Sequence, residues 1–357
     1  MVKYNNSILE AIGMAKLNNR EYTRQQLLRY AGNLSSFAGV TPIEYTQGKS
    51  RGVRAFEVRT GGGLEFTVTQ DKCMDIHTLR YRGVTLSQQS KNSLTAPEYG
   101  QPIKGDFSSS VSGGMLFTSG LRNSGPDCVD TDGSYHPTHG RIGATPAENV
   151  CAEARWEGDE YVIEVSGSMR ESALFGHNLL LTRRISTKLG SNELHIHDTI
   201  DNLSPLPEEF CILYHFNYGF PFLSEDLRLT FPENRLVPRT PQAAAGADEA
   251  EKIIAPEDDF FEHVFFREDM APDDDGWCTV LAENPVLGIG SYISYEKKNL
   301  PLLMEWKSML SGDYSLGIEP ANMYIMGRKE ERENGTLPTI PGFGRIEFNL
   351  KVGAFDL

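Results

Sequence analysis

Residues 345–353 read RIEFNLKVG, and apolar and polar side chains alternate through the whole stretch. The apolar set consists of Ile346, Phe348, Leu350 and Val352. The polar set consists of Arg345, Glu347, Asn349 and Lys351. Because successive side chains of a β-strand point to opposite faces of a sheet, this alternation predicts a strand with one buried face.

The same period of two recurs upstream, from about Val53 onward. The clearest runs are LEFTVTQ at 64–70, YVIEVSG at 161–167, LLLTRRIST at 179–187 and ELHIHDTIDN at 193–202. Turn residues such as Gly190-Ser191-Asn192 separate them, which is typical of antiparallel neighbours. No long helical pattern intervenes, so a parallel βαβ sheet is disfavoured. The sequence predicts an all-β fold, a sandwich or barrel of many antiparallel strands, and no fixed-period repeat supports a propeller.

The first fifty residues have a different pattern. Residues 1–50 predict a short helical extension, with Thr23 as the N-cap of a helix over 24–30 and Gly32 as its stop. Residues 51–357 are expected to form a single β-domain. Within it, residues 238–275 are rich in Pro, Ala and acidic residues. We interpret them as a long surface excursion, a kind of segment that is often functional, rather than as a domain boundary.

Composition narrows the classes of partner. The chain has 357 residues and a formal net charge of -15 at pH 7, which argues against a nucleic-acid partner, since such affinity depends on Lys and Arg. A small anionic substrate is still compatible, because a few cations can dominate the field inside a cleft. The five cysteines are scattered without CxxC spacing, as expected of reduced thiols. No signal peptide or membrane span is recognisable, so we expect a cytoplasmic protein.

Short catalytic motifs give mainly negative results. The glycine-rich stretches GGGLEF, from Gly61, and SGGMLFTSGLRNSG, from Ser112, lack phosphate-loop and dinucleotide-binding spacing and are interpreted as turns and bulges. No GxSxG or HExxH occurs, so a serine hydrolase or a zincin has no local support. His195 and His197 would share one strand face and could bind a metal, but no third ligand is evident. An exposed or hydrogen-bonded strand face is the preferred interpretation of this pair.

One candidate acid/base residue lies in the aromatic run FCILYHFNYGFPFLSED at 210–226. Alternation places His215 and Asn217 on one strand face and the large aromatic side chains on the other. Two interpretations remain open for His215. It is either a buried histidine that binds a backbone carbonyl or a general acid, because an imidazole titrates near neutral pH.

A candidate carboxylate lies later in the chain. Glu319 directly precedes Pro320, at a strand exit where the loss of water would raise its pKa and make it a usable base. A surface glutamate or a structural ion pair is the competing interpretation. Further side chains that could contact a sugar, or could be ordinary strand and turn residues, are Glu305, Trp306, Lys307, His139 and Arg141.

Taken together, four segments make the chain resemble the aldose 1-epimerase, or galactose mutarotase-like, family, and more closely its uncharacterised bacterial branch. The resemblance runs from about Gly52 to Leu350. Its markers, in order, are DKCMDI with Asp75, THGRIG with His139, IDNLSPLPEEFCILYHFNYGFP with His215, and GIEPAN with Glu319. Each segment is short, and their order and spacing carry the match.

The resemblance implies a β-supersandwich of two large twisted antiparallel sheets, with a sugar in an open cleft on the concave face. It implies that His215 protonates the ring oxygen, that Glu319 removes the anomeric hydroxyl proton, and that His139 binds and polarises the sugar. We therefore expect His215 and Glu319 to face each other across a single sugar-sized hollow. Arg122 in SGLRNSG would correspond to the family's sugar-binding arginine. The other expected substrate-binding residues are Asp75, Arg141, Trp306 and Lys307. This chain has YHFNYGFP where the family has an HPYFNL-like strand, and HGR where the family has HGG. The resemblance therefore does not predict which sugar is the substrate.

The sequence therefore predicts an aldose 1-epimerase (mutarotase), an isomerase that opens and recloses a sugar ring without a metal or cofactor. Its expected partner is a small sugar, and neither nucleic acid nor a membrane is expected. One alternative is a glycoside hydrolase or lyase, which would need a second carboxylate such as Asp75 or Glu305. The others are a non-catalytic carbohydrate-binding protein and a metal-dependent isomerase built on His195 and His197. The sequence does not predict the oligomeric state.

Overall fold

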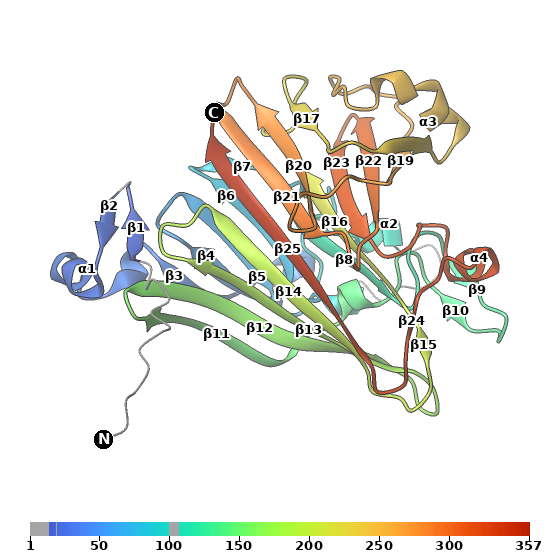
Figure 1. Cartoon of the computed structure of the whole chain (residues 1–357), viewed down its shortest axis with the longest axis horizontal. Helices are drawn as coiled ribbons and strands as arrows, with labels where there is room; N and C mark the ends of the chain where they lie inside the picture. Colours follow the sequence, from blue (N-terminus) through green and yellow to red (C-terminus); the bar gives the residue numbers. More distant parts are fainter. Residues whose placement is uncertain (1–13, 19, 100–106) are drawn as a thin grey trace.

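The structure, a computed structural model, describes residues 14–18, 20–99 and 107–357. Within these residues the strands form three larger sheets and three two-stranded ones. The three larger sheets enclose a common core (Figure 1). No helix of this described part is long and apolar enough to cross a membrane.

The largest sheet has eight strands and crosses Figure 1 diagonally. In spatial order its strands are β11 (Glu148–Glu157), β12 (Glu160–Ser172), β13 (Asn178–Lys188), β14 (Glu193–Asn202), β25 (Arg345–Asp356), β21 (Ile289–Glu296), β20 (Trp277–Asn284) and β17 (Arg228–Thr230). The stretch RIEFNLKVG opens β25, in the middle of this sheet. Phe348, Leu350 and Val352 are buried in the main core and Ile346 packs against it, which confirms the predicted alternation.

A second sheet, of six strands, carries the candidate site. In spatial order its strands are β18 (Arg235–Pro238), β19 (His263–Glu268), β22 (Leu302–Leu310), β23 (Asp313–Ala321), β16 (Cys211–Tyr218) and β8 (Leu116–Leu121). All neighbours pair antiparallel. One face packs on the main core through residues such as Phe216 and Ile318. The opposite face carries a smaller apolar cluster that includes Leu213 and Met304.

The third sheet has five strands and closes the sandwich. They are, in order, β3 (Gly39–Glu44), β4 (Arg54–Arg59), β5 (Leu64–Thr69), β6 (Asp75–Tyr81) and β7 (Val84–Thr85). An isolated bridge between Ser87 and Tyr218 links its end to β16. Phe66 of this sheet, Tyr214 of the six-stranded sheet and Ile196 of the eight-stranded sheet belong to one apolar cluster. The predicted all-β sandwich of large antiparallel sheets is confirmed.

The N-terminal segment is only partly helical. Helix α1 (Arg24–Tyr30) has the predicted N-cap, because Thr23 accepts the N–H of Gln26 and the Gln26 side chain accepts the N–H of Thr23. Strands β1 (Ala15–Leu17) and β2 (Arg20–Tyr22) precede it as a hairpin. Strand β3 then pairs with β4 across residue 50, because a short alternating run is enough to extend a sheet edge. Residues 1–13 lie outside the described residues, and the division into an extension and one domain stays a prediction.

The segment 238–275 is also more ordered than a surface excursion. It contains α3 (Pro241–Ala245), the 3₁₀ helix η5 (Ala247–Glu249) and the whole of β19. Strand β19 lies between β18 and β22 and buries Val264 and Phe265. The expectation of an excursion was therefore wrong for residues 263–268, because the acidic flanks mask a short apolar strand.

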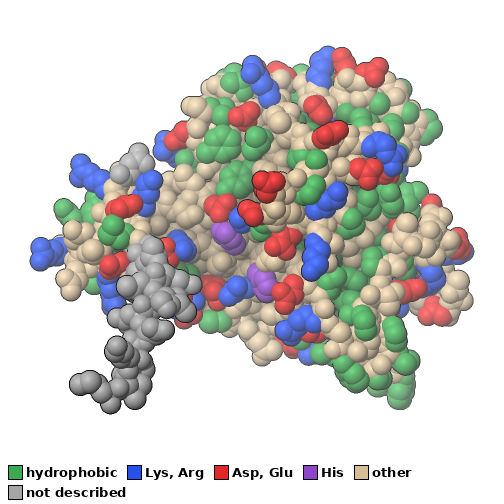
Figure 2. Space-filling view, in the orientation of Figure 1, with side chains coloured by type: hydrophobic (Ala, Val, Ile, Leu, Met, Phe, Trp, Pro, Cys, Tyr) green, Lys and Arg blue, Asp and Glu red, His purple; other side chains and the backbone are tan. Residues whose placement is uncertain are grey.

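The remaining elements are short and lie at the sheet edges and ends. They are η1 (Leu34–Ser36), η2 (Gly48–Ser50), η3 (Pro97–Tyr99), α2 (Phe107–Ser110), β9 (Cys128–Val129), β10 (Tyr135–His136), η4 (Ile142–Ala144), β15 (Glu208–Glu209), α4 (Arg328–Asn334) and β24 (Thr339–Ile340). Figure 1 shows α1 at one end of the molecule and α4, with β9 and β10, at the other. On the face in Figure 2, Lys and Arg side chains are scattered among Asp and Glu rather than gathered in one patch.

Candidate active site

A cleft of about 600 Å³ opens on the face of the six-stranded sheet that points away from the main core. Strand β16 shows how the sequence produces it. Tyr214 and Phe216 point into the main core, whereas His215 and Asn217 line the cleft. The alternation predicted for this strand is therefore present. It places the imidazole of His215 in the cleft and the aromatic side chains in the core behind it.

Strand register brings a glutamate next to this histidine. Leu213 pairs with Ala321 and Phe216 with Ile318, so His215 on β16 lies opposite Glu319 on β23. His215 also pairs with Phe117 on its other side, on β8. Directly opposed residues of antiparallel strands share one face of the sheet. Three adjacent strands therefore place an aromatic ring, an imidazole and a carboxyl group in one row.

His215 and Glu319 are in direct contact. Nε2 of His215 lies 3.0 Å from Oε1 of Glu319, and their side chains are 15% and 2% exposed. The distance suits a hydrogen bond but the alignment does not, and neither Nδ1 of His215 nor Oε1 of Glu319 has a hydrogen-bond partner among the described residues. The sequence had suggested two groups facing each other across a sugar-sized hollow; the structure instead places them side by side on one wall.

Burial controls the charge of this pair. It lowers the pKa of His215 to about 3, with the nearby His139 adding to the shift, and it lowers the pKa of His139 to about 4. Burial raises the pKa of Glu319 well above its usual range, and Glu262 raises it further while Arg239 opposes the shift. Near neutral pH both imidazoles are therefore uncharged, and burial favours the protonated form of Glu319.

A glycine makes room for the contact. Gly317 pairs with Asn217 on one side and with Trp306 on the other. A Cβ atom at position 317 would lie 2.4 Å from Oε1 of Glu319 and 3.0 Å from Cε1 of His215. Only hydrogen fits at this position without displacing the carboxyl group. This role of Gly317 was not predicted, because it depends on side chains of neighbouring strands.

Aromatic rings surround the pair. The ring centroid of Trp306 lies 5.5 Å from that of His215, and the indole N–H donates to Oε2 of Glu262 at 2.6 Å. Phe117 lies 6.3 Å from His215 on the other side. Trp306, predicted as an aromatic platform, lines the cleft beside the His215–Glu319 pair.

His139 reaches the same cleft from the loop before η4. Its Nδ1 lies 3.0 Å from the hydroxyl of Ser119, and its ring centroid lies 6.2 Å from that of His215. The neighbouring Gly140 has a φ of +72°, and a Cβ there would lie 2.0 Å from the carbonyl oxygen of Gly120. The THGRIG loop can therefore pack against β8 only because position 140, directly after His139, is a glycine.

Several polar residues of the cleft were missed by the sequence analysis. Arg239 and Glu262 come from the segment 238–275, which was noted as often functional although no residue in it was singled out. Lys91 and Asp313, which also line the cleft, form an ion pair of 2.6 Å. Hydroxyl and amide groups complete the lining, from Gln88, Ser90, Ser108, Ser308 and Asn217.

Two predicted binding residues lie on the core side of the six-stranded sheet, away from the cleft. Asp75 is buried, accepts hydrogen bonds from Thr118 and pairs with Arg183 at 2.7 Å. Lys307 follows Trp306, so alternation turns it away from the cleft. Its Nζ donates to the backbone carbonyl oxygens of Glu249, Ala250 and Lys252. Both side chains stabilise the fold and neither lines the cleft.

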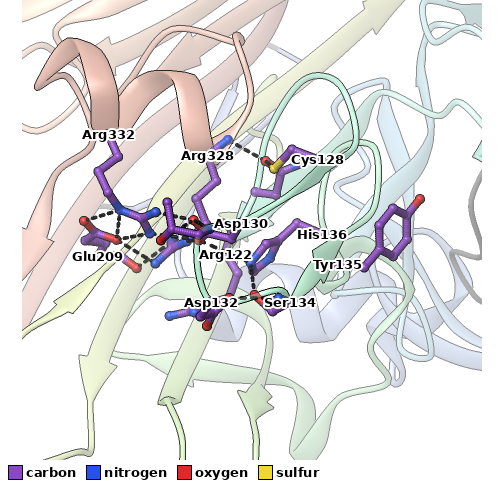
Figure 3. A network of polar contacts seen from close by, with 12 residues as sticks. Arg122, Cys128, Asp130, Asp132, Ser134, Tyr135, His136, Glu209, Arg328 and Arg332 are labelled. Atoms are coloured by element: carbon purple, nitrogen blue, oxygen red, sulfur yellow. Dashed lines mark hydrogen bonds and ion pairs between the residues drawn. The ribbon is translucent and has the colours of Figure 1, made fainter.

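Arg122 and Arg141 also lie outside the cleft. Arg122 forms an ion pair with Glu208. Figure 3 shows it beside a network in which Arg328 and Arg332, from α4, point towards Asp130 and Glu209. The guanidinium of Arg141 donates to the carbonyl oxygen of Tyr135. The expectation that these arginines bind sugar in the same cleft as His215 is therefore corrected.

The residues behind the alternative hypotheses have other partners. Glu305 is fully buried and binds Arg267 at 2.7 Å, so it does not face Glu319 across the cleft. His195 pairs with Glu193, and His197 lies 3.8 Å from Glu347. No group of three or more His, Cys, Asp or Glu side chains in the described part of the chain is arranged to hold a metal.

Comparisons with known proteins agree with the fold. The family model described as Domain of unknown function (DUF4432) matches residues 50–354. A candidate aldose 1-epimerase from Klebsiella pneumoniae is 23% identical, with a TM-score of 0.83, over 89% of this chain and 83% of that one. A galactose mutarotase-like protein from Clostridium acetobutylicum is 14% identical, with a TM-score of 0.64, over 90% and 100% of the two chains.

A galactose 1-epimerase from Lactobacillus acidophilus is 13% identical, with a TM-score of 0.56, over 89% of this chain and 99% of that one. The sequence has no significant match among curated proteins. At these identities the likeness shows the galactose mutarotase-like fold, and it confirms the resemblance predicted from the four sequence segments.

Proposed function

This chain belongs to the DUF4432 family, and from that membership and the geometry of its cleft we propose that it is an isomerase of the aldose 1-epimerase type. It would interconvert the α and β anomers of an aldose. The observation that carries the proposal is the His215–Glu319 pair, two buried acid/base groups 3.0 Å apart on the wall of a sugar-sized cleft. The proposal requires no metal or cofactor.

The chemistry needs one acid and one base. Ring opening begins when a proton leaves O1 of the sugar and another reaches the ring oxygen O5, so that the C1–O5 bond breaks and an open-chain aldehyde forms. Both oxygens are bonded to C1, so two adjacent side chains can reach them from the same side. We assign Glu319 to O1 and His215 to O5, the roles that the resemblance implies. Rotation about C1–C2 and reclosure, with the roles reversed, gives the other anomer.

The shared proton must move before the ring opens. Burial favours the proton on Glu319, whereas the assigned roles require it on His215. Nε2 of His215 and Oε1 of Glu319 are 3.0 Å apart, so a change in side-chain torsion that aligns them would allow direct transfer, and the transfer changes neither the net charge nor the number of protons on the pair. Sugar hydroxyls entering the cleft can solvate the ion pair so formed. Acid/base catalysis of this kind is worth roughly 10²- to 10⁴-fold per group.

Other cleft residues would hold the sugar. We propose that His139 hydrogen-bonds a hydroxyl group through the ring nitrogen that does not contact Ser119, and that the Trp306 ring packs on an apolar face of the sugar. A cytoplasmic location belongs to the same proposal, and the five unpaired cysteines support it.

Exchange NMR between the α and β anomers tests the proposal directly. We would screen a panel of neutral and acidic aldoses against enzyme-free samples, because mutarotation also proceeds spontaneously. The proposal predicts an exchange rate that rises in proportion to protein concentration for at least one aldose. Binding of a sugar without any exchange would favour a carbohydrate-binding protein, and release of reducing ends from an oligosaccharide would favour a hydrolase.

A further inference from the structure

Arg239 is a cation without a partner inside the cleft. It follows β18, is half-buried and lines the cleft beside Val264. Its backbone N–H donates to the carbonyl oxygen of Val264. Its guanidinium, in contrast, makes no hydrogen bond or ion pair with any other residue that the structure describes. A guanidinium has five N–H donors in a planar fork, and all five are left for solvent or a ligand.

The other charges that line the cleft are engaged. Lys91 pairs with Asp313, and Glu262, exposed at the rim, accepts the indole N–H of Trp306 and forms no ion pair with Arg239. His215 and Glu319 contact each other at 3.0 Å. In the described part of the lining, Arg239 is thus the cation that a substrate can reach without breaking an existing ion pair.

The sheet places Arg239 at a useful distance from the pair. Val264 pairs with Trp306, and Trp306 with Gly317, so Arg239 lies in the same row of the sheet, three strands away from Gly317. At a strand spacing of about 4.8 Å the two main chains are about 14 Å apart. The arginine side chain reaches back over part of this distance, and Trp306 lies between. A sugar that rests on Trp306 with C1 at Glu319 would direct its far end towards Arg239.

We propose that the substrate is an anionic aldose, in which an oxyanion group at the end of the carbon chain remote from C1 binds to the guanidinium of Arg239. This inference rests on the proposed function and adds a substrate class to it. Carboxylate and phosphate oxygens match the fork of a guanidinium in a bidentate manner. A protein with a net charge of -15 repels anions at long range, so a local cation is what such a substrate needs.

The test compares matched neutral and acidic sugars. Exchange NMR would give kcat/KM for galactose and galacturonate, and for glucose, glucuronate and glucose 6-phosphate, so that the carboxylate and phosphate arms are separate. The proteins would be the wild type, Arg239→Gln, Arg239→Lys and a control, Arg184→Gln, at an exposed residue of β13 outside the cleft. Thermal unfolding would confirm that all four are folded.

We expect the wild type to prefer at least one acidic sugar over its neutral counterpart by about 10- to 100-fold, the worth of one charged hydrogen-bonded pair. Arg239→Gln should abolish the difference between the kcat/KM values of acidic and neutral sugars, whatever its effect on both, and Arg239→Lys should keep part of this difference. Equal or better use of neutral sugars by the wild type would overturn the inference. An equal loss for both kinds of sugar in Arg239→Gln would also overturn it, because Arg239 would then bind a ring hydroxyl.

Failure of the proposed function gives a different result. If no aldose exchanges faster than in enzyme-free samples, the epimerase proposal fails and the inference is judged by calorimetric titration with the same sugars. Tighter binding of galacturonate or glucose 6-phosphate than of galactose, lost in Arg239→Gln, would uphold the anion site. Equal binding of acidic and neutral sugars, or no binding of either, would overturn it.

Discussion

Gly317 and Glu319 lie two residues apart on the same face of β23, and a Cβ atom at position 317 would come within 2.4 Å of Oε1 of Glu319. The carboxyl group can touch His215 only because this position carries no side chain. The acid/base pair therefore depends on a residue that takes no part in proton transfer.

Gly317→Ala should reduce kcat by about 10- to 100-fold, because a displacement of about 1 Å in a catalytic group has effects of this size. The thermal unfolding midpoint should change little, since the closest atom, Oε1 of Glu319, is the end of a side chain, and Cε1 of His215 and Cβ of Trp306 need to yield by only a few tenths of an ångström. Gly32→Ala is the matched control, because no atom lies within 4 Å of a Cβ at that position. An unchanged kcat in Gly317→Ala would mean that the contact between Glu319 and His215 is not needed.

The activity should be insensitive to pH on the acidic side of neutrality. Burial lowers the pKa of His215 to about 3 and that of His139 to about 4, so neither gains a proton between pH 7 and pH 5. We expect no loss of kcat/KM as the pH falls from 7 to 5, and a loss as the pH rises through the raised pKa of Glu319. A pH profile corrected for spontaneous mutarotation measures this. A midpoint near 6.5, the ordinary value for histidine, would contradict it.

A buried carboxyl group outside the cleft should reduce stability at high pH. Burial raises the pKa of Glu171 to about 7 from its ordinary 4.5. Its contribution to stability is therefore fully present below pH 4.5 and is lost as the pH rises through 7. Glu171→Gln removes this loss, and its carbonyl oxygen can still accept the N–H of Leu121. We expect a gain in the free energy of unfolding of roughly 2 to 3 kcal/mol at pH 8 and little change at pH 4.5, measured by urea denaturation. An equal effect at both pH values would show that ionisation is not the cause.

The network in Figure 3 should be a stability element only. Asp130 is buried between Arg328 and Arg332, and the hydrogen bonds from Arg332 hold its pKa well below the usual range. Asp130→Asn leaves two guanidinium groups without this partner and should lower the free energy of unfolding at pH 7 by roughly 2 to 4 kcal/mol, with kcat unchanged in the folded protein. Asp132→Asn, at a fully exposed position, should leave the unfolding midpoint unchanged. A matching loss in both variants would point to a general charge effect.

Local alternation was enough to predict the strands and part of the site. The period of two in β16 correctly separated His215 from Tyr214 and Phe216, and the pattern in β25 correctly predicted a strand with one buried face. Trp306 was found because it lies near Glu319 in the sequence. In each case the information lies within a few residues.

The remaining features depend on partners far away in the sequence. Lys307 was predicted to bind a sugar beside Trp306. Strand alternation turns it to the other face of the sheet, where the carbonyl groups that its Nζ binds belong to Glu249, Ala250 and Lys252, far away in the sequence. Asp75 was assigned to a sugar and instead neutralises Arg183. The roles of Gly317 and Arg239 follow from strand register across the sheet, which no single stretch of sequence encodes.

The central claim is that Glu319 and His215 act together on one sugar, and the anomer exchange rate of Glu319→Gln measures this most directly. It should be determined with the aldose that exchanges fastest in the wild type, alongside His215→Asn, the double variant, and Glu171→Gln as the same change in a buried glutamate outside the cleft. The account predicts a loss of at least about 100-fold in each single variant, little further loss in the double variant and a wild-type rate in Glu171→Gln. A folded Glu319→Gln protein that exchanges anomers at the wild-type rate would contradict it.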